Sequence, residues 1–543
     1  MAARSRARST KRGRQPVRRL PRWSLPAALA ALLVLWWLLG PLVPLLVTAA
    51  LLLAFLPVRR RLPRLPAPTT RGVLRTSAGG VAGVLVVAAV AWLVPDGRLP
   101  VPSGSGAWVT PGYTGRPVVT RPLTSPPPPR PHLAATSAAG PTGLSVEVDS
   151  GWYGLEQCAR LAQTSGGRLV ASCAGPGSPR LRVVDADGLH PLATKDLPSG
   201  CGHAPFFLDD QDRVVAATAA RELVTVLTAD GAGQPDLTTL AVVDLADVVP
   251  AGDCVATVLP DHDGRTWWAS EAGMVGFVAG DGEVRSRDLG DPVATELVAG
   301  PDGAVYLATT TAHHRLRAGR EEPVVDWRTP YDAGSGRKPG QPLAGTGATP
   351  VLLPGDDGAL LAVTDNANPR MHVGFLRVVD GSEVCRVEVF EDDASASSVP
   401  LVAVARAGVV VTNTHGYDSP WRTVLGRRPA GGLARVDVVD GACTQTWASA
   451  EVVPGAGPVV AAETGVVLAW TKRKSWLLAD AWYLTALDAR TGRTAWAVRG
   501  GRGVGYDAPG SALLLGADAS AYVGTLGGLV RVRDRQPAAR IGP

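Results

Sequence analysis

From residue 145 onward the sequence repeats one pattern about every 50 residues, and this repeat constrains the fold more than any other feature. Each unit holds an apolar strand, a polar turn, a second strand ending in Thr or Ser, a loop, a third strand, a turn and an outer strand. The second strands end in these segments: LVASCAGPGS at 169, RVVAATAARE at 213, TWWASEAGMV at 266, VYLATTTAHH at 305, LLAVTDNANP at 360, VVVTNTHGYD at 409, VVLAWTKRKS at 466 and AYVGTLGGLV at 521.

Eight units of this length predict an all-β fold, a β-propeller of eight blades over residues 144–535, with seven blades as the alternative count. The last unit lacks its outer strand, and LSVEV at 144–148 precedes the first complete unit. Pairing this early strand into the last blade would close the ring and remove its exposed edges. Stacked β-sandwiches are the main alternative architecture, but they predict strands without a regular period.

The clearest repeat is WYLTALDARTGRTAWAV at 482–498, with Asp488, Gly492 and Trp496 spaced four residues apart. It resembles the repeat of PQQ-like (quinoprotein alcohol dehydrogenase-like) β-propellers, in a membrane-anchored bacterial form. In the enzymes of that group, PQQ lies between a Trp and a ring formed by adjacent disulfide-bonded cysteines, beside a calcium held by Glu, Asn and Asp. This chain has no adjacent cysteines, so the resemblance implies the architecture and no PQQ. We expect the tryptophans, including Trp267, Trp268 and Trp447, to be core or blade-docking rings.

Charge separates the N-terminus from the rest of the chain. Residues 1–95 contain fifteen Arg or Lys and no acid, nine of them in the basic segment 1–22. Residues 96–543 contain 39 basic and 48 acidic residues, a formal charge of about −9. An acidic domain of this kind argues against nucleic-acid binding, which needs clustered Lys and Arg.

The region 23–95 predicts membrane helices at about 23–40, 41–58 and 76–95. The uncharged run from Trp23 to Val58 would span about 54 Å as one helix, against roughly 30 Å of hydrocarbon, and Gly40-Pro41 divides it. A hairpin keeps both basic segments in the cytoplasm and lets the third helix export the large domain. One long tilted helix and a signal peptide are the alternatives. We therefore predict a multi-pass protein of the bacterial inner membrane.

Residues 96–143 form a linker rich in Pro, Gly, Ser and Thr, with four prolines at 126–129. Consecutive prolines favour an extended spacer of about 3.1 Å per residue. Such a spacer can hold a domain away from the membrane. Residues 536–543 form a short tail.

All six cysteines lie in the domain expected to be exported, which favours disulfides. Six cysteines allow fifteen connectivities, and position within the repeat favours three pairs: Cys158 with Cys173, Cys201 with Cys254, and Cys385 with Cys443. No CxxC motif or Cys/His cluster suggests zinc.

Polar residues gather in the loops that follow the second strands of the fifth to seventh units. They are Asp365, Asn366, Asn368, Arg370 and His372, then Asn413, His415 and Asp418, then Lys472, Arg473 and Lys474. We predict that the first two groups form a ligand-binding face. Oxygens of Asp365, Asn366 and Asn413 could hold Ca²⁺, whereas Asx-turns and solvated loops are the simpler interpretation. No group is assigned to catalysis, with His372 and His415 as the nearest candidates.

Two other motifs carry little chemistry. GSGRKPGQPLAGTG at 334–347 lacks the ending of a P-loop, so we interpret it as an inter-blade loop. His313-His314 lacks a third metal ligand, so we expect both histidines to be exposed in a loop.

The leading functional hypothesis is a non-catalytic scaffold or sensor for a protein or cell-envelope ligand. The alternative is a calcium-dependent propeller enzyme, either a hydrolase or a degenerate quinoprotein dehydrogenase.

Overall fold

The computed structural model describes Ala82, residues 120–123 and residues 139–535, apart from 155, 176, 355–357, 405–407, 424–426, 474–480 and 512. The membrane helices expected at 23–40, 41–58 and 76–95 therefore lie outside the described residues, except for Ala82. So does the tail from 536 onward. Within the described part of the chain, no helix has the length and apolarity needed to cross a bilayer.

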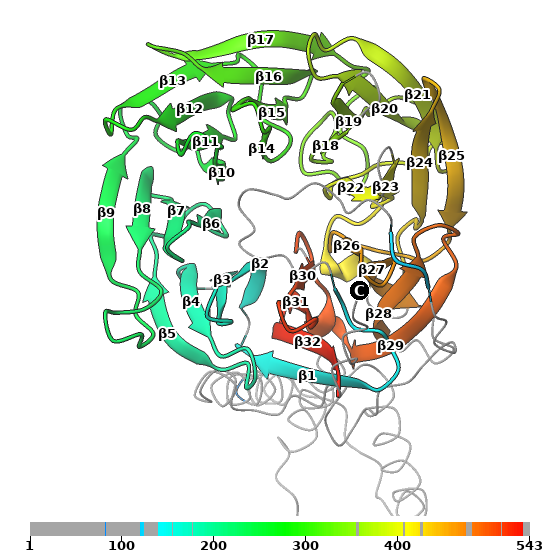
Figure 1. Ribbon diagram of the computed structural model, residues 1–543, viewed down its shortest axis with the longest axis horizontal. Helices are drawn as coiled ribbons and strands as arrows, with labels where there is room; N and C mark the ends of the chain where they lie inside the picture. Colours follow the sequence, from blue (N-terminus) through cyan, green and yellow to red (C-terminus); the bar gives the residue numbers. More distant parts are fainter. Residues whose placement is uncertain are drawn as a thin grey trace, which may run out of the picture. The chain divides into compact units, whose positions relative to one another are not determined.

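The described residues form an all-β propeller of eight four-stranded antiparallel sheets arranged as a ring (Figure 1). This confirms eight blades and excludes seven. Blade 1 contains β2 (Gln157–Gln163), β3 (Leu169–Ala174), β4 (Arg180–Val184) and β5 (Pro191–Asp196), and blade 2 contains β6 (Phe206–Leu208), β7 (Val214–Thr218), β8 (Glu222–Val226) and β9 (Thr239–Asp244). Blade 3 contains β10 (Val255–Pro260), β11 (Thr266–Ser270), β12 (Met274–Val278) and β13 (Val284–Asp288), and blade 4 contains β14 (Val298–Ala299), β15 (Val305–Ala308), β16 (Ala312–Ala318) and β17 (Pro323–Pro330).

The second half of the ring has the same strand order. Blade 5 contains β18 (Val351–Leu353), β19 (Leu360–Thr364), β20 (Met371–Arg377) and β21 (Glu383–Val389), and blade 6 contains β22 (Val402–Val404), β23 (Gly408–Thr412), β24 (Leu433–Val439) and β25 (Ala442–Ser449). Blade 7 contains β26 (Val459–Ala461), β27 (Val466–Arg473), β28 (Ala481–Asp488) and β29 (Thr494–Arg502), and blade 8 contains β30 (Leu513–Leu515), β31 (Ala521–Thr525), β32 (Gly528–Asp534) and β1 (Val146–Trp152). Two short 3₁₀ turns, η1 (Pro420–Arg422) and η3 (Val504–Tyr506), lie in connections.

Antiparallel pairing gives the ring two different faces. The tight turns between first and second strands, and between third and fourth strands, lie on one face, which we call the turn face. The connections between second and third strands, and those between blades, lie on the other, which we call the loop face. The candidate ligand-binding residues belong to the loop face.

The hydrophobic core is divided among the junctions between blades. A cluster of buried apolar side chains lies at each of the eight junctions. Alternate residues of a second strand contribute to different junctions: Leu361 and Val363 of β19 face blade 4, whereas Leu360 and Ala362 face blade 6. Because both faces of the strand are covered, its sequence reads as a continuous apolar run.

A buried hydroxyl lies within, or directly after, the loop-face end of each second strand. These residues are Ser172, Thr218, Ser270, Thr309, Thr364, Thr412, Thr471 and Thr525, and none is more than 6% exposed. They are the Thr and Ser positions that make the repeat visible in the sequence. Thr471, for example, hydrogen-bonds Thr485 of the neighbouring strand, with 2.7 Å between the two hydroxyl oxygens.

The ring is closed by pairing the two ends of the propeller. β1 runs antiparallel to β32 along its whole length, from Val146 opposite Asp534 to Trp152 opposite Gly528. The early strand thus becomes the outer strand of blade 8, as the sequence predicted.

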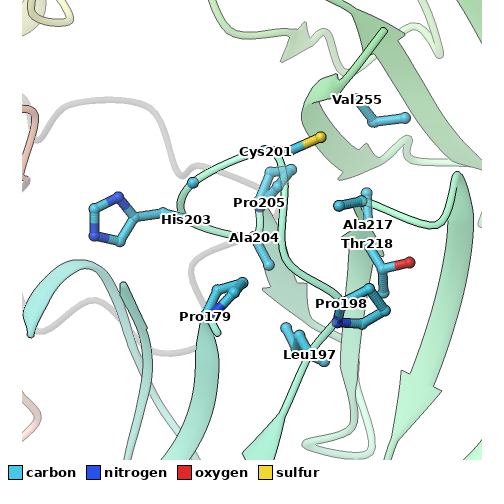
Figure 2. Close-up of a pocket in the computed structure, with 12 residues that line it drawn as sticks. Pro179, Leu197, Pro198, Cys201, His203, Ala204, Pro205, Ala217, Thr218 and Val255 are labelled. Atoms are coloured by element: carbon cyan, nitrogen blue, oxygen red, sulfur yellow. The ribbon is translucent and has the colours of Figure 1, made fainter. Parts of the chain in front are cut away.

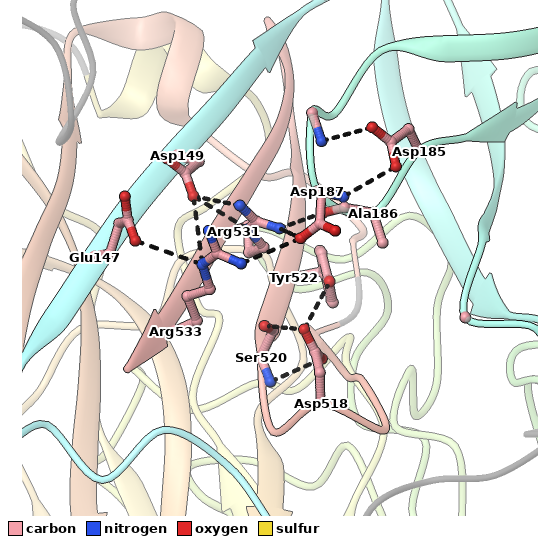
Figure 3. A network of polar contacts seen from close by, with 12 residues as sticks. Glu147, Asp149, Asp185, Ala186, Asp187, Asp518, Ser520, Tyr522, Arg531 and Arg533 are labelled. Atoms are coloured by element: carbon pink, nitrogen blue, oxygen red, sulfur yellow. Dashed lines mark hydrogen bonds and ion pairs between the residues drawn. The ribbon is translucent and has the colours of Figure 1, made fainter. Parts of the chain in front are cut away.

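An ion-pair network supports this closure (Figure 3). The side chain of Arg531 in β32 is 1% exposed, and its Nη2 lies 2.6 Å from Oδ2 of Asp149 in β1. Its Nη1 lies 3.1 Å from Oδ1 of Asp187 and donates to the carbonyl of Ala186, both in blade 1. Arg531 therefore joins both strands of the closure to the next blade.

Tryptophan rings join outer strands to neighbouring blades. Trp447 of blade 6 covers Gly492 of blade 7, where a Cβ would lie 2.5 Å from the ring, and its Nε1 donates to the Ala489 carbonyl at 3.1 Å. Gly492 has φ +68°, a conformation that favours glycine. The pairs Trp327 with Gly381 and Trp496 with Gly143 are built the same way. These contacts explain why Gly and Trp occur at fixed positions of the repeat.

The three disulfides are the pairs favoured by repeat position: Cys158–Cys173, Cys201–Cys254 and Cys385–Cys443. The first links two strands of blade 1. The last links the outer strands of blades 5 and 6. The junctions on either side of it, between blades 4 and 5 and between blades 6 and 7, are instead joined by a Trp ring packed on a glycine. No free cysteine occurs among the described residues.

Part of the segment expected to be a spacer lies against the turn face of blade 7. The backbone N–H of Leu123 donates to the Ala462 carbonyl at 2.9 Å, and the hydroxyl of Thr120 donates to the Thr464 carbonyl. Gly465 admits this approach, because a Cβ there would collide with the Arg121 carbonyl. Residues 142 and 143 also bind Asp534 at the turn-face end of β32. The described parts of the linker thus contact the turn face.

We predict that Arg531→Met lowers the free energy of unfolding by about 2–4 kcal/mol. The substitution leaves the carboxylates of Asp149 and Asp187 and the carbonyl of Ala186 without the guanidinium that binds them in the native protein. Urea denaturation of the full-length protein would measure the loss.

Arg285→Met is the matched control. Arg285 pairs with Asp281 and Glu283 of its own turn, so we expect a loss below about 1 kcal/mol. Equal losses in the two variants would contradict a special role for Arg531 in closure.

Candidate functional site on the loop face

The predicted ligand-binding residues lie on two connections of the loop face. The first group joins β19 to β20 and contains Asp365, Asn366, Asn368, Arg370 and His372. The second lies between β23 and β24 and contains Asn413, His415 and Asp418. Asn366 of the first group and Gly416, in the connection that carries the second, both bind the long connection from β17 to β18, residues 331–350. The structure therefore brings the two groups around one shared loop.

Asp365 and His372 bind each other within their own connection. The Oδ1 of Asp365 accepts the backbone N–H of His372 at 2.6 Å, and its Oδ2 lies 2.7 Å from the His372 Nδ1. Burial raises the pKa of Asp365, and the hydrogen bonds and charge of His372 act in the opposite direction. The carboxylate thus closes the connection between β19 and β20.

Asn366 is fully buried and fastens the inter-blade loop. Its Nδ2 donates to the carbonyls of Ala333 and Gly336 at 3.2 and 3.1 Å, and its Oδ1 accepts from Gln341 at 2.9 Å. Asn368 donates to the Ser335 hydroxyl at 3.0 Å. The glycine-rich segment 334–347 is therefore an inter-blade loop, as expected, and asparagines of blade 5 hold it.

Asn413 caps its own connection. It is 2% exposed, its Oδ1 accepts the N–H groups of His415 and Ala396, and its Nδ2 donates to the Ala394 carbonyl at 2.8 Å. Burial lowers the pKa of His415, and the charge of Lys338 lowers it further.

Lys338 joins the two groups. Its Nζ donates to the carbonyls of Ala367 in blade 5 and Ser395 in the connection to blade 6, at 2.6 and 3.1 Å. Gly340 packs against the backbone of Thr414, which a Cβ would approach to 2.7 Å. This lysine was not singled out from the sequence, where only its place in a glycine-rich loop could have drawn notice.

The charged residues at the rim are paired. Arg370 lies 2.5 Å from Asp392 and 3.6 Å from Glu388. Asp418 binds Arg422 at 2.9 Å. Asp365, Asn366 and Asn413 all use their oxygens within the loops, so binding calcium would require exchanging these hydrogen bonds. Among the described residues, no three His, Cys, Asp or Glu side chains are grouped to hold a metal ion.

A buried polar network that sequence reasoning missed links blades 6, 7 and 8. Asp507, fully buried before β30, accepts hydrogen bonds from the hydroxyls of Tyr417 and Thr423 at 2.7 and 2.6 Å. Lys472 is 1% exposed, and its Nζ donates to the Thr423 carbonyl and lies over the Trp482 ring. Burial raises the pKa of Asp507 to about 6, against the opposing effects of the two hydroxyls and Lys472. A single Asp within GVGYDAPG offers no pattern from which this contact could be inferred.

The network holds a loop that presents an exposed aromatic ring. Trp421 in η1 is 66% exposed, the most exposed aromatic side chain among the described residues. Tyr417 and Thr423, on either side of it, are both bound to Asp507. An exposed Trp on a loop fastened at both ends is suited to serve as a binding anchor.

The expectation that His313 and His314 are exposed loop residues is wrong. Both lie in β16 and are 2% exposed, with His313 stacked on Tyr331 at 4.7 Å. Burial lowers the pKa of His313 to about 3 and that of His314 to about 4. The lack of a third metal ligand made an exposed loop the expectation, but this strand is covered on both sides by neighbouring blades.

A small pocket lies where blade 1 passes to blade 2 (Figure 2). Its lining includes Pro179, Pro198 and Pro205 together with the disulfide-bonded Cys201. His203 is its only titratable group, and the ring Nε2 lies 2.9 Å from the Gln157 carbonyl. Burial lowers the pKa of His203. The pocket is thus mainly apolar and lies apart from the residues of blades 5 and 6.

Comparison with known proteins finds no matching family model and no matching curated relative. Solved structures with a similar fold include the dihydro-heme d1 dehydrogenase NirN, at 11% identity and TM-score 0.45, covering 88% of this chain and 91% of that one. A virginiamycin B lyase from Staphylococcus aureus matches at 10% identity and TM-score 0.40, covering 72% and 99%. U3-55K matches at 9% identity and TM-score 0.38, covering 66% and 100%. None of these values speaks to the activity of this chain.

The buried histidines predict acid sensitivity. Both have folded pKa values below the usual 6.5, so the unfolded chain binds more protons, and stability is lost as pH falls from about 6.5 towards 4. Each histidine contributes a slope of up to about 1.4 kcal/mol per pH unit. His313→Phe should keep the ring contact with Tyr331 and remove one proton from the pH dependence. The free energy of unfolding, measured by urea denaturation across pH 4–7.5, should therefore fall less steeply with acid in the variant.

His262→Phe, which replaces a histidine in an exposed turn, is the control, and the change of slope in His313→Phe should exceed any change that it causes. Asp507 acts with the opposite sign, because its raised pKa favours the folded state as pH falls below about 6. The free energies of unfolding of the native protein and the variants are therefore compared at each pH, where the contribution of Asp507 is common to all of them. An unchanged slope in His313→Phe would contradict the assignment.

Proposed function

We propose that this chain is a membrane-anchored, extracytoplasmic β-propeller of the PQQ-like kind. It acts as a non-catalytic scaffold or sensor and binds a protein or cell-envelope ligand on its loop face. Residues 1–22 lie in the cytoplasm, the helices within 23–95 cross the bacterial inner membrane, and the linker carries the propeller outside.

Three disulfides support an extracytoplasmic location. Such bonds persist in oxidising compartments and are rare in the cytosol. The basic segments on either side of the first apolar run support the same orientation, because positive charge is retained on the cytoplasmic side.

The contacts of the clearest repeat support the PQQ-like resemblance. The Oδ1 of Asp488 accepts the N–H groups of Arg490 and Thr491 and so forms the turn. Gly492 then lies beneath Trp447 of the preceding blade, and Trp496 covers Gly143 of the following one. The Asp of this spacing thus forms the turn, and the Gly and Trp join neighbouring blades.

The observation that carries the proposal is the position of the linker. Thr120 to Leu123 bind the turn face of blade 7, and residues 142 and 143 bind the turn-face end of blade 8. A propeller tethered through its turn face directs its loop face away from the tether. That face carries the long connections and the exposed Trp421.

The alternative of a calcium-dependent enzyme requires more change at the site. Its candidate ligands, Asp365, Asn366 and Asn413, would each have to give up hydrogen bonds that fasten the loops. Rigid, satisfied loops instead support a surface that binds a partner without rearrangement.

We expect a photoreactive benzoylphenylalanine in place of Trp421 to form a discrete covalent adduct in living cells, because this position lies on the proposed binding face. Benzoylphenylalanine in place of Asp281, an exposed turn-face position, is the matched control and should give none. Digestion of the adduct with a protease or a cell-wall hydrolase would separate a protein from a polymer ligand. Adducts at Asp281 alone, at both positions equally, or at neither would refute the proposal.

A further inference from the structure

The connection from β23 to β24, residues 413–432, carries positive charge that the described structure does not balance. It contains three arginines and a single acid, Asp418. The carboxylate of Asp418 is already used, because it accepts three hydrogen bonds of 2.9–3.1 Å from Arg422. Arg427 and Arg428 are exposed, and neither forms a hydrogen bond or an ion pair within the part of the chain that the structure describes. The three residues before Arg427 lie outside that part, and their sequence, VLG, contains no charge.

The neighbouring connection from β17 to β18 adds a third unpaired arginine. The backbone N–H of Gly416 donates to the Pro339 carbonyl at 2.7 Å, and a Cβ on Gly416 would lie 3.9 Å from Pro429. Gly416 therefore holds the loop that carries Arg337 beside the loop that carries Arg428. Arg337 is also exposed, and it too lacks a hydrogen bond or ion pair among the described residues. Three unpaired arginines thus lie in one part of the loop face.

Trp421 extends from the same connection on a turn that is internally fastened. Its side chain is 66% exposed, and no residue of η1 is buried. Pro420 begins the turn with a restricted φ, and the Thr423 hydroxyl donates to the Pro420 carbonyl at 2.7 Å. The ion pair of Asp418 with Arg422 spans the turn. Because the turn is ordered before a partner arrives, less conformational entropy is lost on binding.

The exposure of the ring indicates the shape of the partner. An aromatic side chain contributes most to binding when its apolar surface is removed from water on all sides. This chain leaves about two thirds of Trp421 uncovered, so the partner must provide a pocket that encloses it. A folded protein can provide such a pocket, whereas a flexible polymer chain covers only part of a projecting ring.

The charge around the ring indicates the chemistry of the partner. Guanidinium groups pair best with carboxylates, and Arg and Trp are both enriched in protein interfaces. Residues 96–543 carry a formal charge of about −9, so an acidic partner is repelled by most of the domain. The unpaired arginines attract it to this part of the loop face. Charge would therefore select the docking position as well as the partner.

We propose that Trp421, Arg337, Arg427 and Arg428 form a docking surface for a folded protein that encloses the indole in an apolar pocket rimmed by Asp or Glu. The ring supplies the buried centre of the interface, and the arginines supply its charged rim. This inference deepens the proposed function and rests on it, because both require binding at the loop face. Of the two ligand classes in the proposed function, it selects a protein.

Photo-cross-linking in living cells tests the proposal, with benzoylphenylalanine in place of Trp421 in the full-length chain. Arg427→Glu combined with Arg428→Glu should reduce the adduct at least about tenfold, because like charges then face each other. Arg320→Glu combined with Arg493→Glu is the matched control. It makes the same change of charge at two exposed, unpaired positions of the turn face and should leave the adduct yield unchanged.

Identification of the adduct provides the second measurement. Mass spectrometry should find a protein, joined through a folded domain at a site beside Asp or Glu. Replacing that acidic residue by Arg in the partner should restore the adduct to the chain with Arg427→Glu and Arg428→Glu. Both charge-reversed chains should keep the native midpoint of thermal unfolding, because the replaced side chains have no partner in the described structure.

An adduct with a carbohydrate or another non-protein polymer would overturn this inference and leave the proposed function standing. So would a protein adduct that survives reversal of Arg427 and Arg428, that the turn-face reversal reduces equally, or that the substitution in the partner fails to restore. A lower unfolding midpoint after reversal of Arg427 and Arg428 would mean that these arginines are structural and would overturn it too. Absence of any adduct at position 421 would refute the proposed function itself, and this inference with it.

Discussion

The antiparallel pairing of β1 with β32 is the interaction on which the rest of the structure depends. Every blade buries apolar side chains against two neighbours, so an open ring would expose a junction at each end. Asp149 and Arg531, which meet in this closure, are separated by 382 residues. The entropic cost of joining ends grows only with the logarithm of loop length, so burial at the last junctions can offset it.

Closure also determines how the propeller meets the rest of the chain. Because β1 enters beside the end of β32, the flanking residues Ser145 and Arg535 both lie at the turn face. The contacts of Leu123 with blade 7 reinforce this arrangement. The longer connections are therefore gathered on the opposite face, where Lys338 and Asp507 fasten them to one another. This division of faces follows from strand direction alone and needs no special sequence at the site.

The sequence predicts those parts of the structure that repeat, because every blade uses the same local chemistry. Blade number, closure by β1 and the pairing of Cys385 with Cys443 all follow from the period. Contacts between loops of different blades leave no such signal. Asp507 meets Tyr417 across 90 residues of sequence. The candidate residues Asp365 and Asn413 were found by type, but type could not show that their oxygens serve their own loops.

The central proposal is that the linker tethers the propeller through its turn face, so that the loop face is turned away from the tether. Energy transfer to a labelled lipid tests this most directly, in full-length protein reconstituted into liposomes. A donor dye would be attached to a cysteine in place of Trp421 on the loop face or of Asp281 on the turn face. The account predicts clearly weaker transfer from position 421. Equal transfer, stronger transfer from 421, or failure of the protein to associate with lipid would contradict it.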